Sequence, residues 1–501
     1  MIAPSHAPGN PTSLTDLADQ LLTFVRTAAT QGLPAHEAEQ GIWQRLLALG
    51  RTALGQFFDL QGTGDQGDTV TVPNGPTWAR LPQLHTCRYV SIFGVFQLTR
   101  TAYGSREGQK IEFVPLDNRL QLPASSFSYV LQDWDQGLCV EQAFGQARST
   151  VARILGWPQS VDSLEHMNVE MAQAVADFRE NRPQPDPQTE GAILVTSADG
   201  KGIVMRRSAD APAPAAHRTK GEKASQKRMA TVGTAYTVDR YVRTPDEVLA
   251  ALFREGPTPP PRPQPRHKRV WASLPQPDAD GVAQTSQDVV YTWLLNEVAE
   301  RNPHLAKEMV HLCDGHEALW QARQAHLPAR HTTDILDLLH ATPRLWQAAH
   351  VFHPEGSAAA EAFARARILR VLQGQVTAVV AGLRQLGTKR GLSGAKKKAL
   401  AKACAYLWAN RERMRYDEYL ARGYPIASGV IEGACRHLVK DRMERAGMHW
   451  TPVGAQAMLD VRSTYVNGDW EEYQAYRIQQ ETKRLYPHRH LVEGSQYHMA
   501  V

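Results

Sequence analysis

The stretch that decides the fold is residues 193–207, ILVTSADGKGIVMRR. It begins with a compact apolar run rich in β-branched side chains, and such a run predicts a buried strand. Two more runs of this kind follow, ATVGTAYTV at 230–238 and VWASL at 270–274. A helical pattern from Ser286 to Glu300 separates them from the later strand patterns KEMVHLCDG and TDILD. The resulting order over residues 191–342, β-β-β-α-β-α-β, predicts a mixed α/β sheet.

The chain before this sheet is predicted to be mainly helical. Apolar residues recur at helical spacing after Ser13, and a second helix is predicted from Ala35 to Phe58, within an N-terminal region of residues 1–84. From 85 to 180 we predict a small β segment, YVSIFGVFQLTRTAYG, then an extended connector, FVPLDNRLQLP, and then a helix-turn-helix-like DNA-binding region. The break GWPQ and the cap Ser160 define this last region, although an ordinary αα-hairpin has the same pattern.

The chain after the sheet is also predicted to be helical. We predict a helical insertion at 343–422, a further helix of the core within 423–465, and a tail at 466–501 without a recognisable motif. The proline-rich stretch NRPQPDPQTE, 181–190, is typical of a linker between the N-terminal half and the sheet.

Composition excludes several classes of protein. The chain has 501 residues, of which 42% are hydrophobic and 21% charged, and this excludes a fibrous or disordered protein. No apolar run approaches the roughly 18 residues that a membrane span needs, so no membrane partner is expected. Five cysteines without a CxxC pair exclude a disulfide framework and a zinc finger. These cysteines, and an N-terminal segment without a signal-peptide pattern, predict a cytoplasmic protein.

The net charge of +5 is unevenly distributed. Three acid-poor windows, 201–230, 261–270 and 386–402, together carry +16, so the rest of the chain carries −11. Any single window could be a solvated loop, but three in one chain favour a polyanionic partner, because phosphate contacts supply most nucleic-acid affinity. The basic residues that we select as candidate DNA contacts in these windows are Lys201, Arg206, Arg207, Lys396, Lys397 and Lys398.

Three acidic residues stand out by their positions. Asp199 and Asp314 each end a predicted strand, where ligand-handling residues collect in open α/β sheets, and Glu432 opens a predicted helix. Three such carboxylates can hold two divalent cations about 4 Å apart for a phosphoryl displacement. Mg²⁺ suits this site, with Mn²⁺ as a substitute. A structural role for each remains open, because Asp-Gly is a common turn dipeptide and Glu432 could compensate a helix terminus.

The sequence also resembles a known family. Residues 416–459, YDEYLARGYPIASGVIEGACRHLVKDRMERAGMHWTPVGAQAML, together with VTSADGKGIVMRR, RPQPRHKRVWASL and ILDLLHATPRLWQAAHVFH, look like the ISKra family of bacterial insertion-sequence transposases. The resemblance covers roughly 85–465, and its most specific motif is SGVIEGACRHLVKDRM followed by GMHW. It implies a DDE transposase whose catalytic core is RNase H-like and is split by the helical insertion.

The resemblance assigns roles to the acidic residues. It implies that Asp199, Asp314 and Glu432 are the first, second and third catalytic carboxylates and the metal ligands. Related DDE families carry a Cys/Asp-x-x-His signature after the second carboxylate, and Asp337-Leu-Leu-His340 fits it. Asp337 and His340 are therefore auxiliary candidates, although they could merely fasten a helix to the sheet.

The helix after Glu432 presents further cations. Arg436 and Lys440 follow Glu432 by four and eight residues and so share a helical face, with Arg442 and Arg445 nearby. Such a helix can hold phosphates beside a scissile bond, and we expect Arg436, Lys440 and Arg442 to contact DNA.

The resulting hypothesis is a DNA transposase. It predicts binding of double-stranded DNA at terminal inverted repeats and at the target, nicking and 3′-hydroxyl strand transfer with two Mg²⁺ ions, and a homo-oligomer on DNA. Two alternatives stay open. One is a metal-dependent nuclease without strand transfer, and the other is a DNA-binding protein without catalysis.

Overall fold

The computed structural model describes residues 13–105, 111–206, 227–256, 261–278, 280–445 and 447–492. The chain divides into two units. Unit 1 comprises the residues up to Ala174 together with those from Trp470 onward, and unit 2 comprises Val175–Asp469. Among the helices of the described residues, none is long and apolar enough to cross a membrane.

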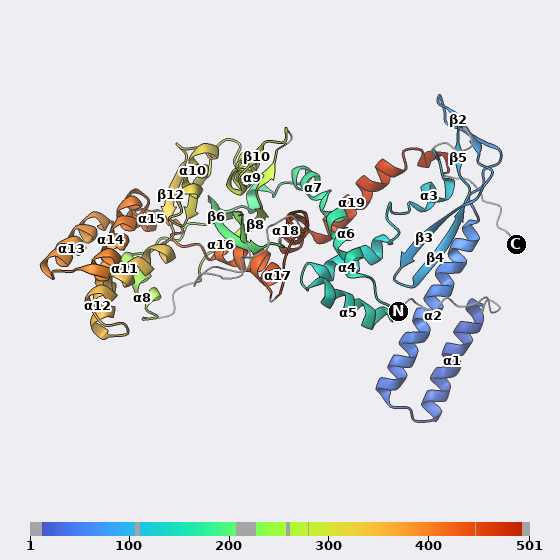
Figure 1. Ribbon diagram of the computed structural model, residues 1–501, viewed down its shortest axis with the longest axis horizontal. Coiled ribbons are helices and arrows are strands. Elements are labelled where there is room, and N and C mark those ends of the chain that lie inside the picture. The colour runs from blue at the N-terminus through green and yellow to red at the C-terminus, as the bar shows by residue number, and fades with distance from the viewer. Residues whose placement is uncertain are drawn as a thin grey trace, which may run out of the picture. The chain divides into compact units, whose positions relative to one another are not determined.

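Unit 2 is built around a five-stranded mixed sheet with the strand order β12-β11-β6-β7-β8 (Figure 1). Strand β11 pairs in parallel with both β6 and β12, whereas β7 runs antiparallel to both of its neighbours. The predicted order of strands and helices is confirmed, with two additions: helix α8 between the second and third strands, and a pair of short strands, 276–277 and 283–284, after the third. The strands are β6 (Ile193–Val204), β7 (Lys227–Val238), β8 (Arg266–Ser273), β11 (Glu308–Cys313) and β12 (Thr332–Leu336).

Helices cover both faces of this sheet, because successive side chains of a buried strand point to opposite faces. Leu194 and Ala198 of β6 pack in one apolar cluster with α9 and α10. Ile193 and Val195 pack in the other with the helices from α11 to α15. The helices of unit 2 before the third carboxylate are α7 (Val175–Asn181), α8 (Pro245–Leu252), α9 (Ser286–Arg301), α10 (Glu317–His326), α11 (Leu338–Phe352), α12 (Ala358–Leu372), α13 (Val376–Lys389), α14 (Gly394–Ala409) and α15 (Tyr416–Ala421).

The C-terminal part of unit 2 returns to the sheet. Helix α16 (Gly429–Ala434) continues directly into a π-helical segment, η3 (Cys435–Lys440), and then into α17 (Asp441–Met443). Trp450 then pairs with Met205 at the end of β6, and α18 (Pro452–Val466) packs on β8. Short β9 (Gln276–Pro277) and β10 (Ala283–Gln284) form a separate two-stranded sheet.

Unit 1 combines a helical hairpin, small sheets and a helical cluster (Figure 1). The two helices predicted near the N-terminus are confirmed as α1 (Leu14–Thr30) and α2 (Ala35–Gln61). The predicted β segment contains the hairpin of β3 (His85–Ser91) and β4 (Gly94–Arg100). A three-stranded sheet contains β1 (Thr69–Thr71), β2 (Thr77–Arg80) and β5 (Tyr103–Gly104). The connector predicted to be extended instead contains α3 (Pro115–Leu120), because Pro115 occupies a first-turn position at which proline favours a helix.

The helix-turn-helix pattern exists in unit 1 within a cluster of three helices. These are α4 (Tyr129–Cys139), α5 (Phe144–Leu155) and α6 (Val161–Ala172). Gly156 ends α5 in the left-handed conformation, and Ser160 caps α6 by accepting a hydrogen bond from the Ser163 N–H. The exposed face of α6 carries Asp162, Glu165 and Glu170, which would repel phosphates.

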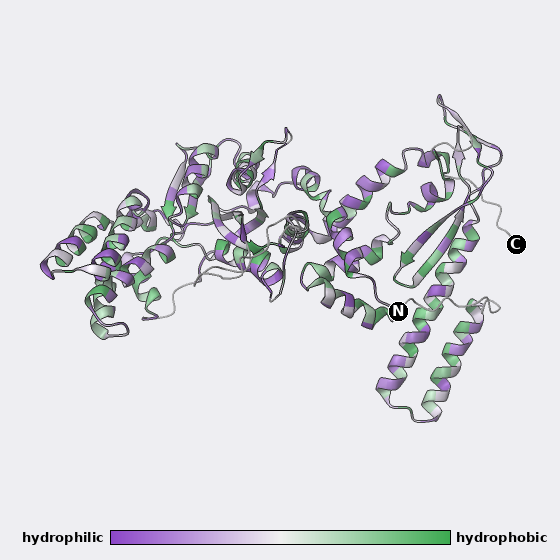
Figure 2. Ribbon diagram, viewed as in Figure 1, coloured by the Kyte–Doolittle hydropathy of each residue, from purple (hydrophilic) through white to green (hydrophobic). Residues whose placement is uncertain are grey.

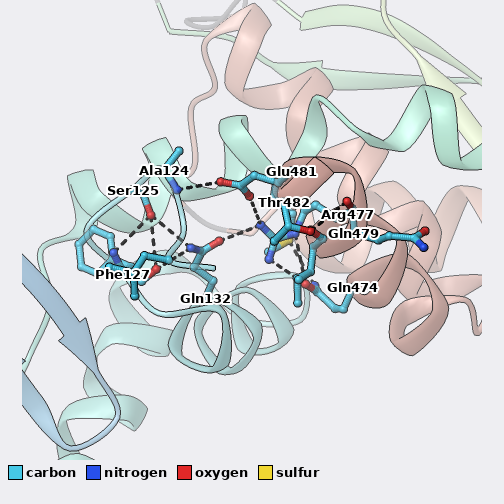
Figure 3. A network of polar contacts seen from close by, with 12 residues as sticks. Ala124, Ser125, Phe127, Gln132, Gln474, Arg477, Gln479, Glu481 and Thr482 are labelled. Atoms are coloured by element: carbon cyan, nitrogen blue, oxygen red, sulfur yellow. Dashed lines mark hydrogen bonds and ion pairs between the residues drawn. The ribbon is translucent and has the colours of Figure 1, made fainter. Parts of the chain in front are cut away.

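The region predicted as a tail contains a long helix, α19 (Trp470–Leu485), that belongs to unit 1. A polar network fastens it to the segment around α4 (Figure 3). Glu481 accepts a hydrogen bond from the Ala124 N–H, and Arg477 donates to the Gln132 side chain at 2.9 Å. The chain therefore leaves unit 1 after α6 and returns to it after α18.

Candidate functional site

Asp199 lies on β6 at the point where this strand leaves β11. Parallel pairing with β11 ends at Ala198, opposite Cys313, whereas antiparallel pairing with β7 continues as far as Val204. The expectation that the strand ends at Asp199 is therefore wrong, because β7 supports it for five further residues. The Asp199-Gly200 pair consequently lies in a strand rather than in a turn.

Asp314 follows β11 directly, so the register places it beside Asp199 on the neighbouring strand. Its carboxylate accepts a hydrogen bond from the His316 N–H at 2.8 Å, and its carbonyl oxygen accepts one from the Trp320 indole at 2.7 Å. These contacts fix the loop that leads into α10. One carboxylate oxygen of Asp314 thus has a structural role, as its Asp-Gly context suggested.

Glu432 lies on α16, which packs against β6 and β7. Its side chain is exposed, whereas Cys435, three residues later, is buried and donates a thiol hydrogen bond to Asp199 at 3.4 Å. Burial and the neighbouring charge of Asp199 raise the pKa of the Cys435 thiol, so this thiol stays protonated and acts as a donor. The helix that carries the predicted third carboxylate therefore contacts the first carboxylate directly.

The π-helical segment begins at Cys435, immediately after α16. Such segments are rare in helices and are frequent at functional sites. Here the segment keeps Cys435 directed at Asp199 while Arg436 and Lys440 remain exposed.

Asp337 is buried at the end of β12, the third parallel strand in this row. Its carboxylate accepts hydrogen bonds from the N–H of Leu339 at 2.7 Å and from the N–H of Ser428 at 3.0 Å. It thereby caps α11 and holds the residue that caps α16. The pKa of Asp337 is raised above its ordinary value because the carboxylate is buried. The two N–H groups and nearby His340 oppose this shift without cancelling it. His340 lies 3.9 Å from the Asp337 carboxylate and is half-buried.

Tyr406 brings the helical insertion to the site. It lies on α14, and a Cβ atom at Gly315 would be 2.6 Å from its hydroxyl oxygen, so the ring sits against the loop that carries Asp314. Burial raises the pKa of Tyr406 to about 12, and the charge of Asp314 adds to this effect. Arg344 of α11 stacks over the same ring at 4.6 Å.

The predicted basic contacts occupy different environments. Arg206, Arg436, Lys440 and the three lysines of α14 (Lys396, Lys397, Lys398) are exposed. Lys201 is half-buried and lies 3.7 Å from the Glu444 carboxylate. Arg207 lies outside the described residues.

Arg442 departs from its expected position, because it is fully buried. Its guanidinium stacks over Trp450 at 5.0 Å, inside the domain rather than where DNA phosphates could reach it. A helix of 3.6 residues per turn places Arg442 about 200° around its axis from Lys440, so Arg442 faces the interior when Lys440 faces outward.

Sequence reasoning missed Cys435, Tyr406 and Ser428. A signal for Cys435 does exist, because a residue three positions after Glu432 lies close to it on a helix. Tyr406 and Ser428 carry no comparable local signal.

The three carboxylates are the kind of ligand that Mg²⁺ prefers, but their positions do not form a complete binding site. Mg²⁺ prefers oxygen ligands, and Asp199 and Asp314 provide them on adjacent strands. Within the described ranges, however, no three His, Cys, Asp or Glu side chains lie close enough together to hold a metal ion. The strand register therefore places Asp199 beside Asp314. Glu432 lies on the helix that contacts Asp199 through Cys435, but its carboxylate does not complete a group of three ligands within the described residues.

Comparisons with known proteins give a structural likeness but no sequence match. No protein-family model matches the chain, and no curated protein matches its sequence. Among solved structures, the Drosophila P element transposase strand transfer complex aligns with 74% of this chain and 88% of that chain, at 10% sequence identity and a TM-score of 0.23.

Proposed function

We propose that the protein is a metal-dependent enzyme that cuts and joins DNA strands with Asp199, Asp314 and Glu432. The observation that carries this proposal is the meeting of Asp199, Asp314 and the Glu432 helix at the point where β6 leaves β11. The strand order β12-β11-β6-β7-β8 supports the RNase H-like core that the sequence resemblance implies. More particularly, the motif around Glu432 and the helical insertion favour a DDE transposase of a bacterial insertion sequence, acting in the cytoplasm.

The chain's own residues would prepare the carboxylates for this chemistry. The Cys435 thiol and the Gly200 N–H orient Asp199, and the His316 N–H orients Asp314. Asp337 holds the start of α16 and so sets the position from which Glu432 projects. Two Mg²⁺ ions, with Mn²⁺ as a substitute, would supply activation of water and of the 3′-hydroxyl. Asp199, Asp314 and Glu432 are the residues that would hold these ions.

Exposed cations around the site would hold the DNA. Arg206, Arg436 and Lys440 lie next to the carboxylates along the chain, and Lys396 lies about 15 Å along α14 from Tyr406, given a rise of 1.5 Å per residue. These residues would position the phosphates of inverted-repeat and target DNA rather than read the sequence.

The test is a cleavage and joining assay on linear DNA that carries the element's terminal inverted repeats, with Mg²⁺. We expect Asp199→Asn, Asp314→Asn and Glu432→Gln each to lower both rates at least about a thousand-fold, because the metal-bound transition state loses a ligand. DNA binding without metal should persist in all three. Glu361→Gln, at an exposed carboxylate of α12, is the matched control.

Undiminished cleavage by any of the three variants would contradict the assignment of that residue. Cleavage by the wild-type protein without joining would instead identify a nuclease. DNA binding without either activity would identify a non-catalytic binding protein.

A further inference from the structure

The helical hairpin of α1 and α2 carries an apolar face that the rest of the described chain does not cover. Within these two helices, all of whose residues the structure describes, only Ala28 is buried. Figure 2 shows hydrophobic residues recurring along both helices. The large apolar side chains that are exposed there are Leu22 (53%), Val25 (42%), Leu46 (41%), Phe57 (45%) and Leu60 (48%). Trp43 is 42% exposed, but its indole donates a hydrogen bond to the Ile154 carbonyl oxygen at 2.8 Å.

Exposed and half-buried apolar residues of α2 form a stripe. Ile42, Leu46, Leu49, Ala53, Phe57 and Leu60 are separated by three or four residues, which places them on one side of the helix. Ala18, Leu22 and Val25 repeat the same spacing on α1. Scattered exposed apolar residues need no explanation, but a continuous stripe on two adjacent helices marks an interaction surface.

Other parts of the same helices are already engaged. Phe24 packs between Arg45 and Gly41, which joins α1 to α2. On α2, Phe58 contacts Tyr89 and Phe96 of the β3–β4 hairpin. The stripe is therefore additional to the surfaces that hold the hairpin within unit 1.

We propose that this face binds the same face of a second copy of the chain, so that two hairpins form a four-helix bundle at a dimer interface. Charge argues against DNA as the occupant, because residues 13–61 carry three arginines and five acidic residues. A two-helix hairpin lacks an interior of its own, whereas two copies facing each other enclose one. An identical surface on each subunit is also what a two-fold interface requires.

The area is sufficient for this role. The 17 residues of α1 span about 26 Å at 1.5 Å per residue, and two adjacent helices are about 20 Å wide. One face then offers about 500 Å² per subunit, or about 1,000 Å² in total, which meets the minimum of about 1,000 Å² for a biological interface. The longer α2 adds to this value, since it extends ten residues beyond the length of α1.

The experiment measures the mass of the full-length protein by light scattering after size exclusion, over a range of concentrations. We expect the wild-type protein to have twice the chain mass of 55.7 kDa, and Leu46→Glu/Phe57→Glu to weaken the dimer at least 100-fold. Both positions are exposed in the single chain, so the circular dichroism spectrum should be unchanged. Val242→Glu, at a position that is 65% exposed in unit 2, should leave the dimer intact.

A cross-link provides a second measurement. Leu46→Cys should give a covalent dimer with a short bifunctional maleimide, whereas the wild-type protein, in which four of the five cysteines are buried, should not. A monomeric wild-type protein, or an unchanged dimer in the glutamate variant, would overturn the proposal. The proposal does not depend on the chemistry at Asp199, and Asp199→Asn should dimerise normally.

Discussion

Gly315 is the residue at which the helical insertion contacts the loop that carries Asp314. A Cβ atom at this position would lie 2.4 Å from Tyr406 Cε2, and overpacking of this kind costs about 1–3 kcal/mol. We therefore expect Gly315→Ala to lower the melting temperature by several degrees and to displace the loop that carries Asp314. Strand cleavage should fall about ten-fold or more, measured in the same DNA assay.

The partner residue supplies the control for this prediction. Tyr406→Ala in the Gly315→Ala background removes the clash and should restore part of the cleavage rate. Gly382→Ala should be harmless, because nothing lies within 4 Å of its Cβ position. A Gly315→Ala protein with wild-type activity and melting temperature would show that Tyr406 moves aside freely.

At the scale of the elements, Asp135 makes the packing of α4 depend on pH. It is fully buried and accepts a hydrogen bond from the Gln159 amide in the turn between α5 and α6. Burial raises its pKa from 3.8 to about 7. Between these two values the folded protein keeps a proton that the unfolded chain releases, so stability falls as the pH rises through this window. The full effect is on the order of 4 kcal/mol, at 1.36 kcal/mol per pKa unit.

We predict that Asp135→Asn removes the loss of stability that the wild-type protein shows as the pH rises. Thermal unfolding at pH 5 and pH 8 should show that the variant gains stability relative to the wild-type protein at the higher pH. Asp19→Asn, at an exposed carboxylate of α1, should leave the difference between the two pH values unchanged. If the melting temperatures of Asp135→Asn and of the wild-type protein change by the same amount between pH 5 and pH 8, Asp135 is ionised in the folded state.

The sequence predicts the elements of unit 2 well, because each strand is a compact apolar run bounded by polar residues. It fails where tertiary pairing overrides a local signal. The GKGIV segment has the composition of a turn, yet β7 keeps it in β6 as far as Val204. Helix α19 was not recognised because its buried face consists of Tyr473, Gln474 and Arg477, which form no apolar pattern.

At the scale of the whole molecule, local patterns also predict the residues of the candidate site but not the long-range contacts that arrange them. The two aspartates can be found from the sequence because each follows an apolar strand. The contacts that arrange them join residues far apart in the chain, such as Cys435 with Asp199 across 236 positions and Ser428 with Asp337 across 91. No local pattern encodes such pairs.

The distribution of charge over the molecule leads to the last prediction. Lys396, Lys397 and Lys398 lie exposed on α14, the helix whose Tyr406 reaches the Asp314 loop, so DNA held at the carboxylates can pass over them. Each phosphate contact contributes about 0.9 to the slope of log affinity against log salt. Replacing all three with alanine should lower affinity similarly for every sequence and reduce that slope by up to about 2.7. The control replaces Arg26, Arg330 and Lys483, which are exposed outside the basic windows. Equal slopes for the two triple variants would show that α14 does not contact DNA, whereas a smaller slope only for the lysine variant would place the DNA path along the helical insertion.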